Sequence, residues 1–375
     1  MSNESSNELV VNPAPHIHGS MTKDRMMQFT FVAILAVTIV SAALWSQVTS
    51  TSGWNLGLTV AIGTLIAVGL AVVLDFLIGR VTSDSEVNTW SAAVFGLIVI
   101  NCFSLGYPSM ATMDGMPIEP GLPVEAPLAF FYIALITIIG MVVFKKVASI
   151  AGRKLVNPAA AAKLLVLLPT TFVTLITSWH LSSGMFVVPS LAGPIGNPAD
   201  GAATAGNGAA SFGGYLQGCY GLTSTESVES VMVLAKYHGW VGGASSLAVI
   251  IAGVALFVIG RKYFKWKITA SYLVAIAVLS LIFSFVFGDV DLTTRLLFTL
   301  FAGSSIFLAF FMATDPATTP FSGTGQIIFG IGLAVLTISI QTFMGFFGGS
   351  FLALLIMNLL VPVIDKIHLT KPFGR

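Results

Sequence analysis

The stretch "GLTVAIGTLIAVGLAVVLDFLIG" occupies residues 57–79 and contains a single charged side chain, that of Asp75. An α-helix of this length extends over about 34 Å, which is enough to cross the ~30 Å hydrocarbon core of a bilayer. The rest of the chain has the same character: 55% of its 375 residues are hydrophobic, 9% are charged, and its mean hydropathy is +0.92. A soluble domain carries about 25% charged residues. The sequence therefore predicts an integral membrane protein.

Apolar runs of similar length recur along the chain and indicate the fold class. By the rule of about 20 apolar residues per crossing, ten spans are predicted, at residues 28–46, 57–79, 90–107, 126–144, 159–178, 239–260, 268–287, 295–313, 324–343 and 349–365. The first run is longer than the roughly 7–15-residue core of a signal peptide, so it is expected to stay in the protein. The predicted fold is an all-α polytopic membrane protein with about ten transmembrane helices.

Basic residues predict the orientation of these spans, because lysine and arginine accumulate in cytoplasmic segments. With the N-terminus inside, 15 of the 17 basic residues lie on the cytoplasmic side, and only Lys236 and Arg295 lie outside. The chain is therefore expected in the cell membrane, surrounded by lipid, with both termini cytoplasmic. Its segments are the cytoplasmic segment 1–27, a first membrane half 28–178, an outer loop 179–238, a second membrane half 239–366 and a cytoplasmic tail 367–375.

Five predicted spans on each side of the outer loop imply two halves of opposite orientation, because an odd number of crossings turns the second half upside down. Inverted repeats are common in transporters, where they place the binding site at the interface between the repeats. The sequence thus predicts two inverted five-helix halves with a site between them.

The segment "FMATDPATTPFSGTGQ", residues 311–326, interrupts the end of the eighth predicted span. It places Asp315 among Thr314, Thr318 and Thr319, and two prolines break the helix. Irregular polar backbone at membrane depth is tolerated only where it is buried in protein or lines a cavity. One interpretation is a functional site around Asp315. The other is a capped turn, in which Asp precedes Pro and the threonines satisfy free amide groups.

Three further polar residues lie in or beside predicted spans. Asn157, directly before Pro158, is typical of a helix N-cap. Lys163 lies in the same span and is expected to extend its side chain toward the inner surface. Asp75 is a default candidate for a functional site, but its place before Arg80 favours an interfacial salt bridge between these two residues.

Several classes of site are excluded by the residue inventory. None of the five histidines lies in a predicted span, so a bis-histidine haem is not expected, and no histidine has a second ligand at metal spacing. The two cysteines, Cys102 and Cys219, are too few to hold an iron–sulfur cluster. A net charge of +1 provides no basic stripe for phosphates. The sequence therefore predicts no metal site and no nucleic-acid partner.

Four separated segments resemble one protein family. They are "PAPHIHG" (13–19), "LVNPAAAA" (155–162), "GWVGGASSLAVIIAGVALFVIGRK" (239–262) and "ATDPATTPFSGTGQIIFGI" (313–331). In this order they are similar to the RnfD/NqrB family, the large flavin-carrying membrane subunits of the Rnf complex and of the sodium-pumping NADH:quinone reductase. The resemblance spans nearly the whole chain, and the segment with Asp315 and its threonines is its most specific part.

The resemblance implies two flavins. Family members carry FMN on a threonine of the outer central loop, joined as a phosphodiester. The best match to their pattern is "DGAAT", where Asp200, Gly201 and Ala203 surround Thr204 as the acceptor; Gly201 stands where the pattern has Ser or Thr. Thr223 and Thr225 are alternative acceptors. A second flavin, riboflavin, is expected between the helices.

The resemblance also implies roles for residues within the membrane halves. Asn157, Thr314, Thr318 and Thr319 are candidate cofactor-binding residues, and Asp315 is the candidate catalytic residue.

The family would make this chain one subunit of an ion-translocating oxidoreductase complex linked to ferredoxin, moving Na⁺ or H⁺. The implied partners are RnfA, RnfB, RnfC, RnfE and the flavoprotein RnfG, which passes electrons to it. Two other classes remain open on the residues alone: a secondary transporter or channel without redox chemistry, and a structural membrane anchor for partner subunits.

Overall fold

A computed structural model describes residues 22–47, 53–82, 88–105, 126–147, 154–167, 240–260, 263–287, 292–301, 304–344 and 349–367. Within these ranges every regular element is helical. The elements are α1 (Lys23–Trp45), α2 (Leu56–Thr82), α3 (Thr89–Asn101), α4 (Ala126–Ile139), η2 (Gly140–Val147), the helix Pro158–Leu167, η5 (Val241–Gly243), α9 (Ser246–Ile259), α10 (Trp266–Phe287), α11 (Leu292–Phe301), α12 (Ser305–Phe307), η6 (Leu308–Met312), α13 (Gly323–Met344) and α14 (Gly349–Ile367). The all-α prediction is confirmed for this part of the chain.

Six of these helical segments are long and apolar enough to cross a membrane. They are Lys23–Trp45, Leu56–Val81, Leu128–Val147, Trp266–Phe285, Gly323–Ile340 and Gly349–Lys366. The predicted third, fifth and sixth spans correspond to shorter apolar helices, Thr89–Asn101, Pro158–Leu167 and Ser246–Ile259. The predicted eighth span is divided among α11, α12 and η6. Within the described residues, about six helical segments are therefore candidate membrane crossings, and the count of ten stays a prediction.

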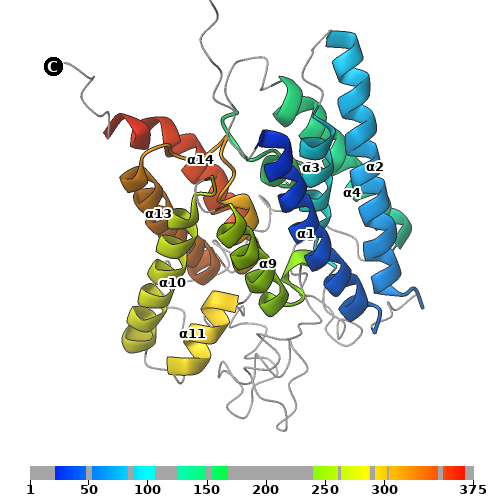
Figure 1. Cartoon of the computed structure of the whole chain (residues 1–375). Helices are drawn as coiled ribbons and strands as arrows, with labels where there is room; N and C mark the ends of the chain where they lie inside the picture. The colour runs from blue at the N-terminus through cyan, green and yellow to red at the C-terminus, as the bar shows by residue number, and fades with distance from the viewer. Residues whose placement is uncertain are drawn as a thin grey trace, which may run out of the picture.

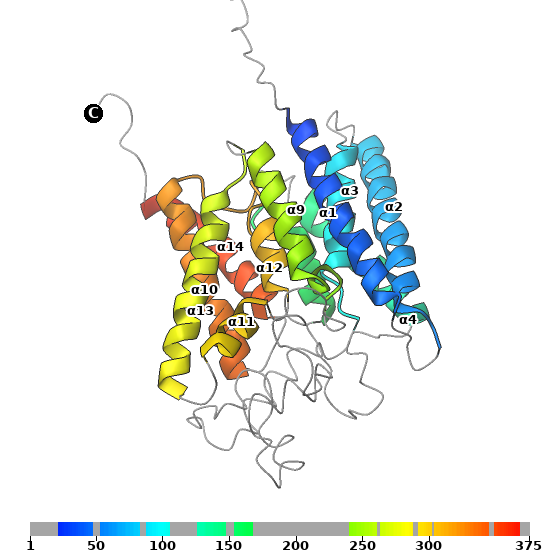
Figure 2. The ribbon, with the colours of Figure 1, turned by 60° about the horizontal axis from the view of Figure 1, so that its bottom comes forward.

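The helices form two groups, with α9 between them (Figure 1). α1 to α4 pack together at one end of the bundle, while α10, α11, α13 and α14 pack at the other, and α9 lies against α1. α1 begins and α14 ends at the same face of the bundle (Figures 1 and 2). Two hydrogen bonds tie this face together, from Asn88 Nδ2 to Asp24 Oδ1 at 2.9 Å and from Phe321 N–H to Asp365 Oδ1 at 3.2 Å.

The perimeter of the bundle is apolar. Leu65 on α2, Val258 on α9 and Phe285 on α10 are 74%, 74% and 82% exposed. An extended apolar exterior of this kind is stable only against lipid or another apolar surface, because monomeric soluble proteins rarely expose contiguous apolar patches above a few hundred Å². The exterior therefore agrees with a multi-pass membrane protein.

The salt bridge predicted between Asp75 and Arg80 is wrong. Asp75 is buried, and its Oδ1 lies 2.7 Å from Nζ of Lys146 at the end of η2. Arg80 instead places its guanidinium 4.7 Å from the centre of the Phe76 ring. Five residues along an α-helix correspond to a rotation of about 140°, so Asp75 and Arg80 point in different directions. The sequence did not predict Lys146 as the partner of Asp75, because the two residues are distant in the sequence.

Close approach of α2 and α3 depends on Gly96. A Cβ at this position would lie 2.7 Å from the Ala67 carbonyl oxygen and 2.7 Å from Val68 Cα, both of which are backbone atoms of α2. Backbone atoms cannot rotate away as a side chain can. The absence of a side chain at Gly96 therefore sets the separation of these two helices.

We expect Gly96→Ala to destabilise the protein by about 1–3 kcal/mol, the usual range for overpacking a filled interface. Gly69→Ala on α2 is the matched control, because a Cβ there would meet no atom within 4 Å. The thermal midpoint of the detergent-solubilised protein, followed by fluorescence-detected size exclusion, should fall only for Gly96→Ala. Equal midpoints for the two variants would contradict this account of the interface.

Candidate functional site

Residues 313–320 connect η6 to α13 and form a compact turn around Asp315, here named the Asp315 turn. Asp315 Oδ1 accepts a hydrogen bond from Ala317 N–H at 3.1 Å, and the Thr319 hydroxyl donates to the Asp315 carbonyl at 2.6 Å. Thr314 is buried and donates to the Phe310 carbonyl at 2.8 Å. This geometry is that of an Asx turn, one of the two interpretations that the sequence allowed.

Lys265, just before α10, stabilises the Asp315 turn by hydrogen bonds to its backbone and to Thr319. Its Nζ donates to the carbonyls of Pro316 and Thr319 at 3.2 and 2.9 Å, and to the Thr319 hydroxyl at 2.7 Å. The two prolines break the helix and release backbone carbonyls, so an ammonium with three donors is well suited to satisfy them. In the sequence, Lys265 contributes only to the charge of the inner face, and its contacts with this turn were not predicted.

Asn157 caps the helix Pro158–Leu167, as its position before proline predicted. Its Oδ1 accepts hydrogen bonds from Ala159 N–H at 3.1 Å and Ala160 N–H at 3.3 Å. The residue is buried, so these amides would otherwise lack a partner. The structure therefore confirms that Asn157 is the N-cap of this helix.

Asn358 in α14 joins this cap to the Asp315 turn. With its amide oriented to satisfy both groups, Asn358 accepts from Asn157 N–H at 2.9 Å and donates to the Thr318 carbonyl at 3.1 Å. All three residues are buried. The two motifs singled out in the sequence, "NP" and "TDPATTP", therefore meet inside the bundle at one asparagine. Asn358 was missed, although a lone amide in the apolar run "LLIMNLLVP" is the available signal.

A second lysine, Lys145, lies near the junction that Asn358 forms with Asn157 and Thr318. Lys145 in η2 is only 7% exposed, and its Nζ has no hydrogen-bond partner in the described ranges. Its Nζ lies 5.6 Å from the centre of the Phe95 ring, and the charges of Lys154, Asp75, Lys146 and Asp315 act on it. Lys145 is thus a buried amine surrounded by charges of both signs.

Lys163 does not extend to the inner surface, so that expectation is wrong. It is 1% exposed, and its ammonium donates a hydrogen bond to the Cys102 carbonyl at the end of α3. Trp240 and Phe351 place their rings 5.4 and 4.3 Å from Nζ. The carbonyl and the two ring faces offer the ammonium an alternative to hydration, which is why the side chain turns inward.

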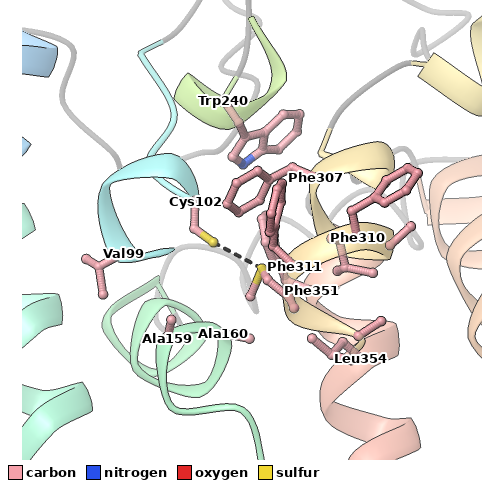
Figure 3. Close-up of a cluster of buried hydrophobic side chains, with 14 of the residues drawn as sticks. Val99, Cys102, Ala159, Ala160, Trp240, Phe307, Phe310, Phe311, Phe351 and Leu354 are labelled. Atoms are coloured by element: carbon pink, nitrogen blue, oxygen red, sulfur yellow. Dashed lines mark hydrogen bonds between the residues drawn. The ribbon is translucent and has the colours of Figure 1, made fainter. Parts of the chain in front are cut away.

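The surroundings of Lys163 are a dense apolar cluster (Figure 3). Trp240 at η5, Phe307 of α12 and Phe351 of α14 gather beside the end of α3, and Cys102 Sγ lies 3.2 Å from Met312 Sδ. Cys102 is a free cysteine and is buried in this cluster. The elements in contact come from both ends of the chain, so this cluster connects the two helix groups.

A flavin beside the Asp315 turn would need donors for its ring carbonyls. The hydroxyl protons of Thr314 and Thr319 are directed to backbone carbonyls, so neither is available. The buried ammonium of Lys145 is a donor that no described residue uses. Among the described residues, Lys145 thus offers a buried donor without a hydrogen-bond partner, and the cofactor roles of Thr314, Thr319, Asn157 and Thr318 stay predictions.

The residues predicted to carry FMN lie outside the described residues. They are Asp200, Gly201, Ala203 and Thr204, with the alternatives Thr223 and Thr225. Their assignment stays a prediction from the sequence.

Comparison with known proteins gives relatives over nearly the full length. The D subunit of the Na⁺-translocating ferredoxin:NAD⁺ oxidoreductase complex of Acetobacterium woodii is 26% identical over 369 residues, which cover 98% of this chain and 95% of that protein. The D subunit of the proton-translocating ferredoxin:NAD⁺ oxidoreductase complex of Clostridium ljungdahlii is 23% identical over 372 residues, covering 98% and 97%. The D subunit of an ion-translocating oxidoreductase complex of Shewanella amazonensis is 32% identical over 269 residues, covering 66% and 73%.

A family profile agrees with these relatives. The profile of the NQR2, RnfD, RnfE family matches residues 111–374, which include Asn157, the Asp315 turn and Asn358. The match begins after α3 and extends from α4 to the end of α14. The chain belongs to the NQR2, RnfD, RnfE family.

Proposed function

We propose that this chain is the D-type, flavin-carrying membrane subunit of an ion-translocating oxidoreductase complex linked to ferredoxin. The observation that carries the proposal is the full-length similarity to the D subunits of two ferredoxin:NAD⁺ oxidoreductase complexes. It is supported by the meeting of the "NP" and "TDPATTP" motifs at Asn358. The chain would act together with RnfA, RnfB, RnfC, RnfE and RnfG rather than alone.

The finer architecture belongs to the same proposal: ten membrane passages in two inverted five-helix halves, with both termini cytoplasmic. Three short apolar helices and the divided helix α11–α12–η6 occupy positions where passages were predicted. Described basic residues support the orientation, since Lys23 begins α1 and Lys366 is in the last turn of α14, both at one face of the bundle. That face would be the cytoplasmic one.

Two flavins would supply the redox chemistry, since in such proteins the cofactor carries out electron transfer and the protein supplies binding, orientation and electrostatics. FMN would be attached to Thr204 on the outer side, next to RnfG, and riboflavin would bind between the helices near the Asp315 turn. The protein would place the rings and set the local charge. Lys145, Lys265 and Asp315 are among the charged groups available for that role near the Asp315 turn.

The ion that is moved is not determined by the similarity. One relative is named as Na⁺-translocating and another as proton-translocating, at 26% and 23% identity to this chain. Transport measured in proteoliposomes with each ion in turn would assign it. In-gel fluorescence of the denatured protein under ultraviolet light tests the redox proposal itself, because only covalently attached flavin survives denaturation.

We expect FMN to be esterified to Thr204. A tryptic peptide that contains Thr204 should carry the mass of one FMN less one water, because the phosphodiester forms by condensation. Thr204→Ala should remove both this mass and the in-gel fluorescence. Finding the FMN mass on Thr223 or Thr225 would contradict this assignment and leave the flavoprotein proposal intact, whereas finding none in the assembled complex would contradict covalent attachment.

We expect residues 179–238 to lie outside the cell and residues 145–158 to face the inside. A single cysteine at Ser211 should react with a membrane-impermeant maleimide in intact cells, and one at Ser149 should react only after permeabilisation. The reverse pattern would overturn the proposed orientation.

We expect Asp315→Asn to lower electron transfer and ion pumping by about tenfold or more while the complex still assembles. Asparagine keeps the shape of the turn and its acceptor toward Ala317 N–H but removes the charge near Lys145. One lost charge-assisted interaction is worth on the order of 1.5–3 kcal/mol, and about 1.4 kcal/mol corresponds to a factor of ten.

The control is Asp365→Asn, which alters another carboxylate that accepts from a backbone N–H at the same face. Turnover and pumping should change little in this variant. Near-normal turnover and pumping in an assembled Asp315→Asn complex would show that the residue only shapes the turn.

A further inference from the structure

Helix α3 ends inside the bundle. Its 13 residues extend over about 20 Å, less than the ~30 Å hydrocarbon core. Its first turn lies at the face where α1 begins, because the cap residue Asn88 donates to Asp24. The carboxyl end of α3, at Asn101 and Cys102, therefore lies within the apolar layer rather than at either surface.

A helix carboxyl end in such a place attracts cations. It carries a partial negative charge and unpaired carbonyls, and broken helices in transporters use such ends to coordinate Na⁺. Asn101 adds a side-chain oxygen, Oδ1, that is buried and has no partner among the described groups. Small cations would be drawn to this point by its chemistry alone.

The Lys163 side chain already places a positive charge at the end of α3. The Lys163 ammonium donates to the Cys102 carbonyl and faces the rings of Trp240 and Phe351. A carbonyl oxygen and aromatic faces are ligands that a free alkali cation would use. The side chain is tethered to the helix Pro158–Leu167, so it cannot leave.

We propose that Lys163 is a tethered cation that prevents passive leakage of Na⁺ and other small cations through the junction between the two helix groups. Its ammonium occupies the Cys102 carbonyl and repels other cations from the end of α3, where Asn101 Oδ1 has no partner among the described groups. Electrostatic exclusion by a fixed cation is a known way to keep positive ions out of a membrane pore. The role goes beyond the proposed electron transfer and does not depend on which flavins the chain carries.

A leak measurement tests this role separately from turnover. The purified complex that contains the chain is reconstituted into liposomes, and uptake of ²²Na⁺ down an imposed gradient is followed without any electron donor. Lys163→Met keeps most of the length of the side chain but removes the charge, and Lys163→Arg keeps the charge. Lys366→Met, which removes an exposed lysine at the end of α14, is the matched control.

We expect Lys163→Met to raise passive ²²Na⁺ uptake by about tenfold or more, since a unit charge a few ångströms away is a large barrier at low dielectric constant. Lys163→Arg and Lys366→Met should stay near the wild-type rate. Wild-type leakage in an assembled Lys163→Met complex would overturn the proposal.

Lys163→Gln guards against a purely structural role for the lysine, because it is also uncharged but keeps a hydrogen-bond donor for the Cys102 carbonyl. Raised leakage in Lys163→Gln supports the proposal. If neither neutral variant assembles while Lys163→Arg does, the charge is required for folding and the barrier role is rejected.

Discussion

Every backbone group inside a membrane must find its hydrogen-bond partner within the protein, because lipid offers none. This constraint determines how the irregular backbone segments at the centre of the molecule are held. The turn after η6 is held by Lys265, the start of the helix Pro158–Leu167 is held by Asn157 and Asn358, and the end of α3 is held by Lys163. Lys265, Asn358 and Lys163 each come from a part of the chain distant from the backbone that they satisfy. Irregular structure at depth therefore also fastens the two helix groups to each other.

The long helices could be predicted closely from hydropathy. α13 was expected at 324–343 and is Gly323–Met344, and α10 was expected at 268–287 and is Trp266–Phe287. Local capping was equally accessible, since Asn157 before Pro158 has its partners two and three residues away. These features depend on neighbouring residues alone, which is why composition and spacing suffice.

The predictions that failed concerned contacts between residues that are distant in the sequence. Hydropathy predicted the eighth span as one helix, but an apolar composition does not reveal the division among α11, α12 and η6. The rule that lysine extends to the nearest surface failed for Lys163, because its aromatic neighbours Trp240 and Phe351 come from other elements. The partner of Asp75 was likewise on another helix. Asn358, which connects the two predicted motifs, could only be recognised once the fold had brought them together.

Charged residues from both halves of the chain lie near the junction. Asp315 belongs to the second half of the chain and Lys145 to the first, and the charges of Lys154, Asp75, Lys146 and Asp315 all act on Lys145. A change of charge on either side alters the same interaction, and a low dielectric environment makes such interactions strong. Asn358 connects the Asp315 turn to the helix cap, because its amide bonds both the Thr318 carbonyl and the Asn157 N–H. The position of the turn and the start of the helix Pro158–Leu167 therefore depend on the same buried side chain.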